Sequence, residues 1–506
     1  MPFFFLFLDK YNEIFLYCVN EQKEWGVYMY VPSGLDKAVQ ILNDSTKFLV
    51  YYDTDIDGAV AGELVRRILD KYKKYYRIYI NENRQHGLKL TDTQLKKLEG
   101  FTIILVDAGV TREEVEKCVN LGVSIIVIDH HEVHEDKLIY VENEKTKAKG
   151  VIINNQYVFE PKEYRFLSGA GVVYYVLKNL FPHDIGVEEE FLVGISLLSD
   201  VREIENSRAR YFLEKTYSYR SDYVNYLIDL TKPLKDYSFG EYVFDRNFID
   251  YYFNTSVNAL FRLNKGYDAI DVFSRKYNGS SLVVFKENQM VIRDKMLERT
   301  KITEFSNYVV AVLDYNSLGV DGGYDITNFV GLVCSRLRSQ YGKTVLYVVQ
   351  DNGVIKRGSV RGKKDGVDYL KIFKDNGFIA DGHKIAFGVT GLYKSIDFNK
   401  INQDIEKEEQ TVIETKKVLE VTNLSFMLHN GVIEKIAYEN NFVRSEKRTV
   451  LKYIGSEVTV QDFPKLTKYI IDGVEILCFN KDLDITKGYI VPLIEKGKYL
   501  KFYLTE

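Results

Sequence analysis

Three aspartates lie at alternate positions in one short stretch of the chain: Asp53, Asp55 and Asp57. The apolar, β-forming run 47–52 precedes them, and residues 59–65 have the spacing of a helix. Ligands of open α/β sheets bind where a strand ends in this way. Carboxylates held close together repel one another, and one of them takes up a proton unless a cation intervenes. Because carboxylate oxygens suit Mg²⁺ and Mn²⁺, the stretch indicates a divalent-metal site. A solvated acidic turn is the alternative that such a short motif leaves open.

Two further apolar runs also end on an aspartate. Residues 101–106 lead to Asp107, and residues 124–128 lead to the triplet Asp129-His130-His131. A helical segment separates the two runs, and this strand–helix alternation predicts a parallel sheet with all the strand ends on one edge. A single aspartate after a strand is usually a helix cap. Three such aspartates beside a pair of histidines favour a metal site instead.

A fourth acidic position, Asp200, follows the predicted helix 190–198. Taken alone, it would be a helix terminus or a surface charge. Together with the strand-end carboxylates and an imidazole, it would complete the ligands of a two-metal site. Such a site holds two cations about 3.5–4 Å apart and clamps both the attacking and the leaving oxygen of a phosphoryl group.

The elements that would position these side chains predict an α/β protein with four parts. A parallel-sheet domain is joined through a helix at 293–304 to a second α/β domain, and a β-rich C-terminal domain follows. The predicted parts are residues 1–210 with N-terminal strands, a helical bridging region at 211–305, the second α/β domain at 306–403, and a charged helix (405–421) with the β-rich domain at 404–506.

Composition excludes several classes of protein. The formal net charge of −4 means that a nucleic-acid partner must be held by local basic patches. The four cysteines form no CxxC pair, which argues against a zinc ribbon or a disulfide framework and favours a reducing, cytoplasmic location. The run at 3–8 is too short for a signal core and predicts a buried strand. No apolar run approaches the length of a membrane span.

The ordered motifs resemble those of the DHH phosphoesterase superfamily, in the sequence Asp53-Thr54-Asp55-Ile56-Asp57-Gly58, Val106-Asp107, Asp129-His130-His131 and Ser199-Asp200. Within that superfamily the chain is most similar to RecJ-type single-strand exonucleases. The supporting stretches are Arg84 with Gly87-Leu88, the segments 168–172 and 258–263, and the Gly-His segment 381–388, which resembles the signature of the DHH-associated C-terminal domain. The resemblance covers roughly residues 36–400.

We hypothesise two-metal hydrolysis of phosphodiester bonds, with two Mn²⁺ or Mg²⁺ ions held by Asp53, Asp55, Asp57, Asp107, His130 and Asp200. Asp107 is the candidate bridging ligand. Asp129 and His131 are expected to orient the ligands or to contact the scissile phosphate. The residues expected to bind the substrate are Arg84, Ser168, Asn258, Arg262, Ser335, Arg336, Arg361 and His383.

The RecJ resemblance implies single-stranded DNA as substrate and 5′-to-3′ polarity, in repair, recombination or replication. It leaves RNA open as a substrate and implies a single-strand-binding protein or a helicase as partner. It also implies an oligonucleotide-binding barrel after the second domain. One alternative is a DHH phosphodiesterase for short oligonucleotides or cyclic dinucleotides. Another is a non-catalytic replication protein, although every expected metal ligand is present.

Overall fold

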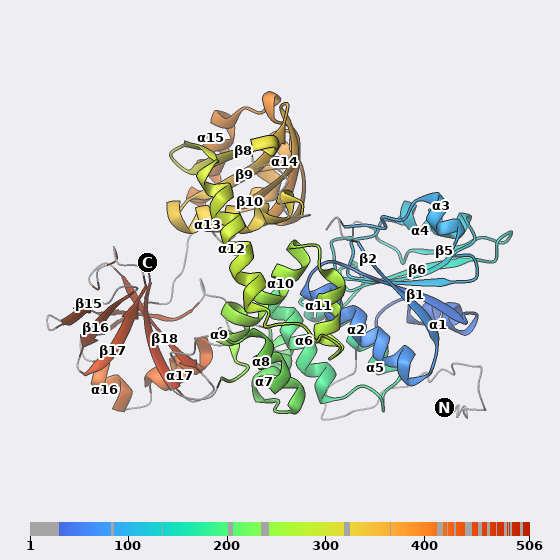
Figure 1. The fold of residues 1–506 in the computed structure, drawn as a ribbon, viewed down its shortest axis with the longest axis horizontal. Coiled ribbons are helices and arrows are strands. Elements are labelled where there is room, and N and C mark those ends of the chain that lie inside the picture. The colour runs from blue at the N-terminus through green and yellow to red at the C-terminus, as the bar shows by residue number, and fades with distance from the viewer. Residues whose placement is uncertain are drawn as a thin grey trace.

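The computed structural model contains three β-sheets and a layer of helices (Figure 1). It describes residues 30–81, 86–133, 135–200, 206–233, 242–317, 324–364, 366–411 and, with short gaps, 418–505. The predicted strand at 3–8 and the substrate-binding residue Arg84 lie outside the described residues. Within them, no helix is long and apolar enough to cross a membrane.

The first sheet has six strands in the order β2-β1-β3-β4-β6-β5, all parallel except for β5. Its strands are β1 Lys47–Tyr52, β2 Tyr75–Ile80, β3 Thr102–Val106, β4 Ser124–Asp129, β5 Tyr140–Glu142 and β6 Lys149–Asn154. Its helices are α1 Leu35–Asn43, α2 Ile56–Lys71, α3 Asp92–Lys96, α4 Arg112–Asn120 and α5 Gly169–Leu180.

Both faces of this sheet are covered, which explains why its central strands are continuous apolar runs. Helices α1, α2 and α5 lie on one face, and α3 and α4 lie on the other (Figure 1). Within β1, Val50 packs toward the first group of helices and Tyr51 toward the second. The strand order reverses between β1 and β3, because β2 lies on the far side of β1. The first sheet therefore has a topological switch point at the β1–β3 boundary.

A helical layer follows the first sheet and packs into the same core. Its elements are α6 Val187–Ser199, α7 Ser207–Ser218, α8 Asp222–Thr231, α9 Arg246–Phe248, the π-helical turn Ile249–Phe253, α10 Asn254–Arg262, α11 Gly266–Phe273 and α12 Val283–Glu298. Helix α12 leads from this layer to the second sheet, where Ile292 and Met296 join the core (Figure 1). The helix predicted at 293–304 is therefore wrong in its second half: it ends at Glu298, and Lys301–Glu304 form strand β7.

The second sheet has the order β11-β12-β10-β9-β8-β7, with only β8 and β9 parallel. The remaining strands are β8 Tyr308–Asp314, β9 Thr344–Asp351, β10 Val354–Arg361, β11 Ile379–His383 and β12 Ala386–Leu392. Its helices are η4 Ile326–Phe329, α13 Val330–Tyr341, α14 Tyr369–Asp375 and α15 Phe398–Thr411. Helix α13 covers one face, and α14 and α15 cover the other.

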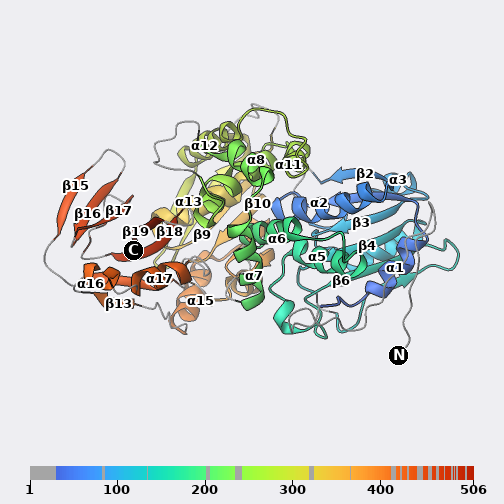
Figure 2. The same ribbon diagram turned by 90° about the horizontal axis from the view of Figure 1, so that it is seen from below.

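The C-terminal part contains a seven-stranded sheet in the order β13-β14-β18-β19-β17-β16-β15 (Figure 2). Its elements are β13 Val418–Val421, α16 Leu424–His429, α17 Val432–Asn440, β14 Val450–Tyr453, β15 Thr459–Asp462, β16 Thr467–Ile471, β17 Val474–Cys478, β18 Tyr489–Glu495 and β19 Tyr499–Thr505. The charged helix predicted at 405–421 ends at Thr411, and β13 pairs with β14. The predicted α/β class with a β-rich C-terminal region is confirmed. The oligonucleotide-binding barrel stays a prediction.

Candidate metal centre

The strand-end aspartates meet at the switch point of the first sheet. Asp53 directly follows β1, Asp107 directly follows β3, and Asp129 is the last residue of β4. The three strands are neighbours and pair in parallel register, so their carboxyl ends lie side by side. All three side chains are almost completely buried. The structure therefore brings together carboxylates that are far apart in sequence.

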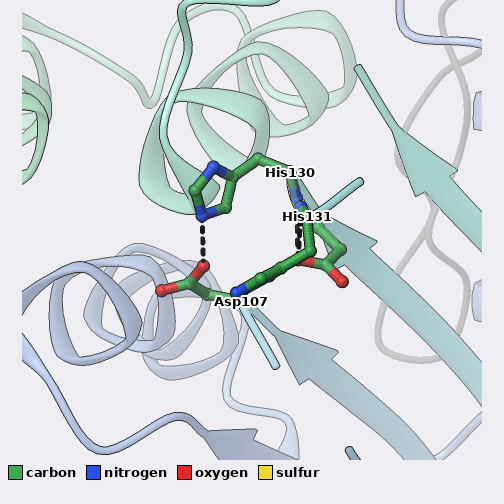
Figure 3. Close-up of side chains that lie close together, drawn as sticks. Asp107, His130 and His131 are labelled. Atoms are coloured by element: carbon green, nitrogen blue, oxygen red, sulfur yellow. Dashed lines mark hydrogen bonds and ion pairs between the residues drawn. The ribbon is translucent and has the colours of Figure 1, made fainter. Parts of the chain in front are cut away.

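Asp107 has a left-handed backbone conformation, with a φ of 58°. Aspartate is one of the few residues other than glycine that visit this region readily. The conformation turns the chain at the end of β3 while the N–H of Asp107 still donates to the carbonyl of Ile128, over 3.0 Å. Oδ1 of Asp107 lies 2.9 Å from Nε2 of His130. Figure 3 shows the two side chains pointing toward each other. Asp107 thus occupies the centre of the cluster.

The possible metal ligands form overlapping groups around Asp107. In each group, one ligand atom per residue lies within 4.8 Å of the others. Each group has at least three residues, and the groups are Asp53 with Asp55 and Asp107; Asp57 with His130 and Asp200; and Asp107 with Asp129, His130 and His131. The first two groups contain all six predicted ligands. Asp107 belongs to the first group, and its Oδ1 lies 2.9 Å from Nε2 of His130 in the second.

Asp57 is fixed by the start of helix α5. Its Oδ2 accepts from the N–H of Gly169 at 2.7 Å, and its Oδ1 accepts from the N–H of Ala170 at 2.9 Å. The hydroxyl of Ser196 also donates to Oδ1, at 2.6 Å. Ser168, predicted to bind substrate, is fully buried, and its hydroxyl pairs with that of Ser196. Its position corrects that prediction, because Ser168 lies behind Asp57 and supports it instead of facing a substrate.

Asp129 is engaged by hydrogen-bond donors. Its Oδ1 accepts from the N–H of His130 at 2.7 Å, and Oδ1 lies 2.7 Å from Nδ1 of His131. Its Oδ2 accepts from the N–H of Gly109 at 2.9 Å. Burial alone would lower the pKa of His131, but the charge and hydrogen bond of Asp129 raise this pKa to about 10. The pair therefore suits an orienting carboxylate and a cationic imidazole near a phosphate.

The electrostatics of the cluster fit a divalent cation. Burial, followed by the charges of Asp200 and Asp55, raises the pKa of Asp57 from 3.8 to about 7. Burial and four neighbouring carboxylates raise the pKa of Asp107 well above its ordinary value. The site is thus unfavourable for the ionised forms of Asp57 and Asp107, and a hard cation bound by their oxygens would relieve this repulsion.

A pocket of about 1330 Å³ adjoins the cluster and lies between the first and second sheets. The first-sheet side contributes Asp55, Asp107, His130, His131 and Asp200 to its lining. Four of the predicted substrate-binding residues line it, namely Arg262, Ser335, Arg361 and His383. Nε2 of His383 lies 3.9 Å from Oδ1 of Asp200, so the two sides meet at the cluster. Asn258 and Arg336 are not among the lining residues.

Arg361 is suited to bind an anion. Its Nη1 donates to the hydroxyl of Ser359 at 2.6 Å and to the carbonyl of Val360 at 2.8 Å. Burial lowers the pKa of its guanidinium. Among the residues that the structure describes, no carboxylate lies within ion-pair distance of Arg361. A half-buried guanidinium of this kind is stabilised by a phosphate, whose oxygens match its planar donors.

Comparison with known proteins relates this chain to the DHH family and to RecJ-type exonucleases. Residues 47–197 match the profile of the DHH family, N-terminal domain. This region is a DHH domain, and the fold of the chain is RecJ-like. A putative SPbeta prophage-derived single-strand DNA-specific exonuclease, YorK, of Bacillus subtilis (strain 168) is 24% identical over 482 residues, covering 86% of this chain and 77% of YorK. The crystal structure of RecJ with Mn²⁺ from Thermus thermophilus matches with a TM-score of 0.66 and 17% identity, covering 94% of this chain and 72% of RecJ.

The DHH domain contains site residues that the sequence did not single out. Nδ1 of His86 lies 3.5 Å from Oδ2 of Asp53, and Ser196 positions Asp57. In the second sheet, Ser359 and Arg357 line the pocket beside Arg361. His86 lies between Arg84 and Gly87, and Ser359 lies two residues before Arg361, so both stand beside residues that the sequence singles out. Ser196 gave no signal, because it is one of several small residues in an apolar helix.

Metal affinity of the DHH domain should depend on pH. Because the pKa of Asp57 is about 7 in the metal-free fold, a cation must displace a proton below that pH. We expect the Mn²⁺ association constant to rise by about tenfold per pH unit for each displaced proton, and the contribution of Asp57 to this rise to end at about pH 7. Calorimetric titration of the metal-free protein from pH 5.5 to 8 measures this.

The stability of the metal-free protein should change in the opposite direction. A raised carboxyl pKa stabilises the folded state at low pH, and this contribution is lost as the pH rises from about 4 to 7. Asp57→Asn, which cannot ionise, should remove the part of both pH dependences that comes from this residue. Equal Mn²⁺ affinity at pH 5.5 and 7 would contradict the expected rise in metal affinity with pH.

Proposed function

We propose that this chain is a metal-dependent exonuclease that hydrolyses phosphodiester bonds in single-stranded DNA. The observation that carries the proposal is that one pocket adjoins the possible metal ligands, Asp107 among them, and is also lined by Arg262, Arg361 and His383. Metal ligands thus share a pocket with side chains suited to bind phosphate. The single-strand specificity in the name of YorK and the RecJ-like fold support the same hydrolase class.

Six residues would hold two divalent cations: Asp53, Asp55, Asp57, Asp107, His130 and Asp200. When bound, the cations make water a stronger nucleophile near neutral pH and neutralise the charge on the attacking and leaving oxygens. Either Mn²⁺ or Mg²⁺ suits this ligand set, and the RecJ structures of Thermus thermophilus were solved with each of them.

The other residues act on the substrate. His131, whose pKa the neighbouring Asp129 raises in the metal-free fold, can donate a hydrogen bond to a phosphate oxygen, while Asp129 holds its ring in place. Arg262 and Arg361 bind phosphates of the strand, and their fixed charges stabilise the charge that develops on phosphorus oxygens. His383 binds from the second sheet, close to Asp200.

The finer parts of the proposal are 5′-to-3′ polarity, a role in DNA repair, recombination or replication, and a cytoplasmic location. They rest on the RecJ resemblance and on the absence of cysteine pairs in the sequence. A single-strand-binding protein or a helicase would deliver the strand, and RNA is a further candidate substrate.

Digestion of end-blocked strands tests the proposal. The substrates are internally labelled single strands of DNA and RNA, blocked at the 5′ or the 3′ end, with a blunt DNA duplex as control. In Mn²⁺, we expect progressive shortening of single-stranded DNA that a 5′ block prevents and a 3′ block does not. Cleavage of dinucleotides or cyclic dinucleotides alone would replace the proposal with a short-substrate phosphodiesterase. Binding of DNA without any cleavage would support a non-catalytic replication protein.

A further inference from the structure

The loop that follows β6 presents two exposed apolar side chains, in a segment between two residues that line the pocket. Val158 is 73% exposed and Phe159 is 44% exposed. On either side of them in sequence, Gln156 and Lys162 line the pocket. β6 is the neighbour of β4, and its last residue, Asn154, pairs in register with Asp129. The exposed pair therefore follows the strand next to the one that carries Asp129.

The tip of this loop is held from within. Nη2 of Arg165 donates to three backbone carbonyls of the loop, those of Tyr157 (3.0 Å), Val158 (3.1 Å) and Glu160 (3.4 Å). The ring of Phe159 stacks on that of Tyr157, with centroids 4.8 Å apart and planes 15° apart. One face of Phe159 is thus fixed against a buried ring.

The loop is also fixed from behind. The hydroxyl of Tyr157, a fully buried residue, accepts from the N–H of Ile139 at 3.2 Å. The carboxylate of Glu160 accepts from the hydroxyl of Tyr30 at 2.9 Å and from the N–H of Ser33 at 2.8 Å. An exposed aromatic ring held this firmly loses little conformational entropy when a ligand covers it.

The surroundings of the tip favour a nucleic-acid strand as that ligand. Lys162 is exposed and lines the pocket, as does Arg112, which forms an ion pair with Glu135. A rigid aromatic ring with a lysine three residues further along the same loop offers a face that can stack on a base and an ammonium group that can attract its phosphate. A partner protein would be expected to cover a broader apolar patch than two residues.

We propose that Phe159 is a stacking platform for a nucleobase of the substrate strand, outside the metal centre, and that Lys162 binds an adjoining phosphate. This inference rests on the proposed nuclease function and adds a subsite to it. The platform is sequence-tolerant, because every base has a π face. It keeps the strand extended across the carboxyl edge of the sheet while the terminal phosphodiester reaches Asp107 and His130.

Binding of a fluorescein-labelled oligo-dT strand to the full-length protein in EDTA measures the platform without cleavage. We expect Phe159→Ala to weaken binding about tenfold, within the range measured for loss of one stacked base. Phe159→Trp should restore the affinity. Phe159→Leu should not, since it keeps an apolar side chain but loses the ring face. Replacing the dT residues by abasic sites one at a time should, at one position, weaken wild type and leave Phe159→Ala unchanged.

Tyr75→Ala is the matched control. Tyr75 is a 52% exposed aromatic residue at the amino end of β2, on the edge of the sheet opposite to the pocket, and its substitution should leave binding unchanged. Lys162→Ala should lower affinity for every strand sequence and reduce the salt dependence of binding by about one counterion.

The outcomes separate this inference from the proposed function. If wild type degrades and binds single strands but Phe159→Ala binds as tightly as Tyr75→Ala, the platform is overturned and the nuclease stands. If Phe159→Leu binds as tightly as wild type, stacking is overturned in favour of a plain apolar contact. If wild type neither binds nor degrades single strands, both proposals fall.

Discussion

Asp107→Asn is expected to abolish cleavage while leaving the metal-free protein folded and more stable than wild type. The carboxylate of Asp107 lies within 4.8 Å of possible ligand atoms in two groups of the cluster, and asparagine supplies no charge to either. Loss of an outer-sphere partner of a metal ligand already costs about 10–100-fold, so loss of a shared ligand should reduce the cleavage rate by about 10³-fold or more.

The expected gain in stability follows from the same repulsion. Burial and the charges of Asp57, Asp55, Asp53 and Asp200 raise the pKa of Asp107 well above its ordinary value, so its ionised form is unfavourable in the metal-free fold. A neutral amide of nearly equal volume removes that penalty. Thermal melts of the metal-free proteins at pH 8 measure this, and the difference should shrink as the pH falls.

A matched substitution controls for the change of charge. Asp36→Asn alters a carboxylate whose side chain is 66% exposed in helix α1 and should change neither the cleavage rate nor the melting temperature appreciably. Cleavage by Asp107→Asn within tenfold of wild type would show that Asp107 is not a shared ligand. If Asp107→Asn cleaves at the wild-type rate, then cleavage does not take place at this edge of the sheet.

The parts of the fold predicted correctly are those in which local pattern and burial agree. The strands before Asp53, Asp107 and Asp129 are buried on both faces, so their sequences are continuous apolar runs that end where the polar edge begins. Because parallel strands place their carboxyl ends together, the convergence of these aspartates followed from the topology alone. The switch point between β1 and β3 could not be predicted in this way, because it depends on the order of the strands in the sheet.

The elements that were missed are exposed ones. All residues of β7, Lys301–Glu304, are exposed, and the strand exists because it pairs with β8 at the edge of the second sheet. Its charged sequence continues the pattern of α12, so only the tertiary pairing shows where the helix stops. Strand β13 follows the charged helix α15 in the same way, and three of its four residues are exposed.

The roles of polar residues depended on burial that the sequence does not show. Ser168 and Arg361 were both predicted to bind substrate, yet Ser168 is buried behind Asp57, whereas Arg361 lines the pocket. Ser168 and Arg361 differ in exposure because they lie on different sides of the cluster. The packing of α5 and β10 sets these positions, and the spacing of residues along the chain does not determine them.

Gly169→Ala is expected to disturb the metal centre from a position that binds no metal. A Cβ atom at Gly169 would lie 2.6 Å from Cβ of Asp107, closer than real Cβ atoms approach. The N–H of residue 169 that donates to Asp57 is kept in alanine, so the substitution tests the close approach alone. Asp107 is held by its left-handed backbone and by Ile128, which leaves it little room to move.

We therefore expect Gly169→Ala to lose about 1–3 kcal/mol of folding free energy, as for other overpacked sites. Displacement of Asp107 should weaken Mn²⁺ binding by about 10–100-fold, the range for disturbed outer-sphere partners. Denaturant unfolding and calorimetric titration measure the two effects. Circular dichroism at the titration temperature checks that the variant is folded.

Gly186→Ala provides the control, because the residue before α6 has a φ of −133° and its nearest neighbouring atom is 3.8 Å from the added Cβ. It should change the folding free energy by no more than about 0.5 kcal/mol and leave Mn²⁺ binding intact. If Gly169→Ala binds Mn²⁺ as tightly as wild type and Gly186→Ala, then Asp107 either tolerates displacement or is not a ligand. The Asp107→Asn result decides between these two, since only a ligand loses cleavage when its charge alone is removed.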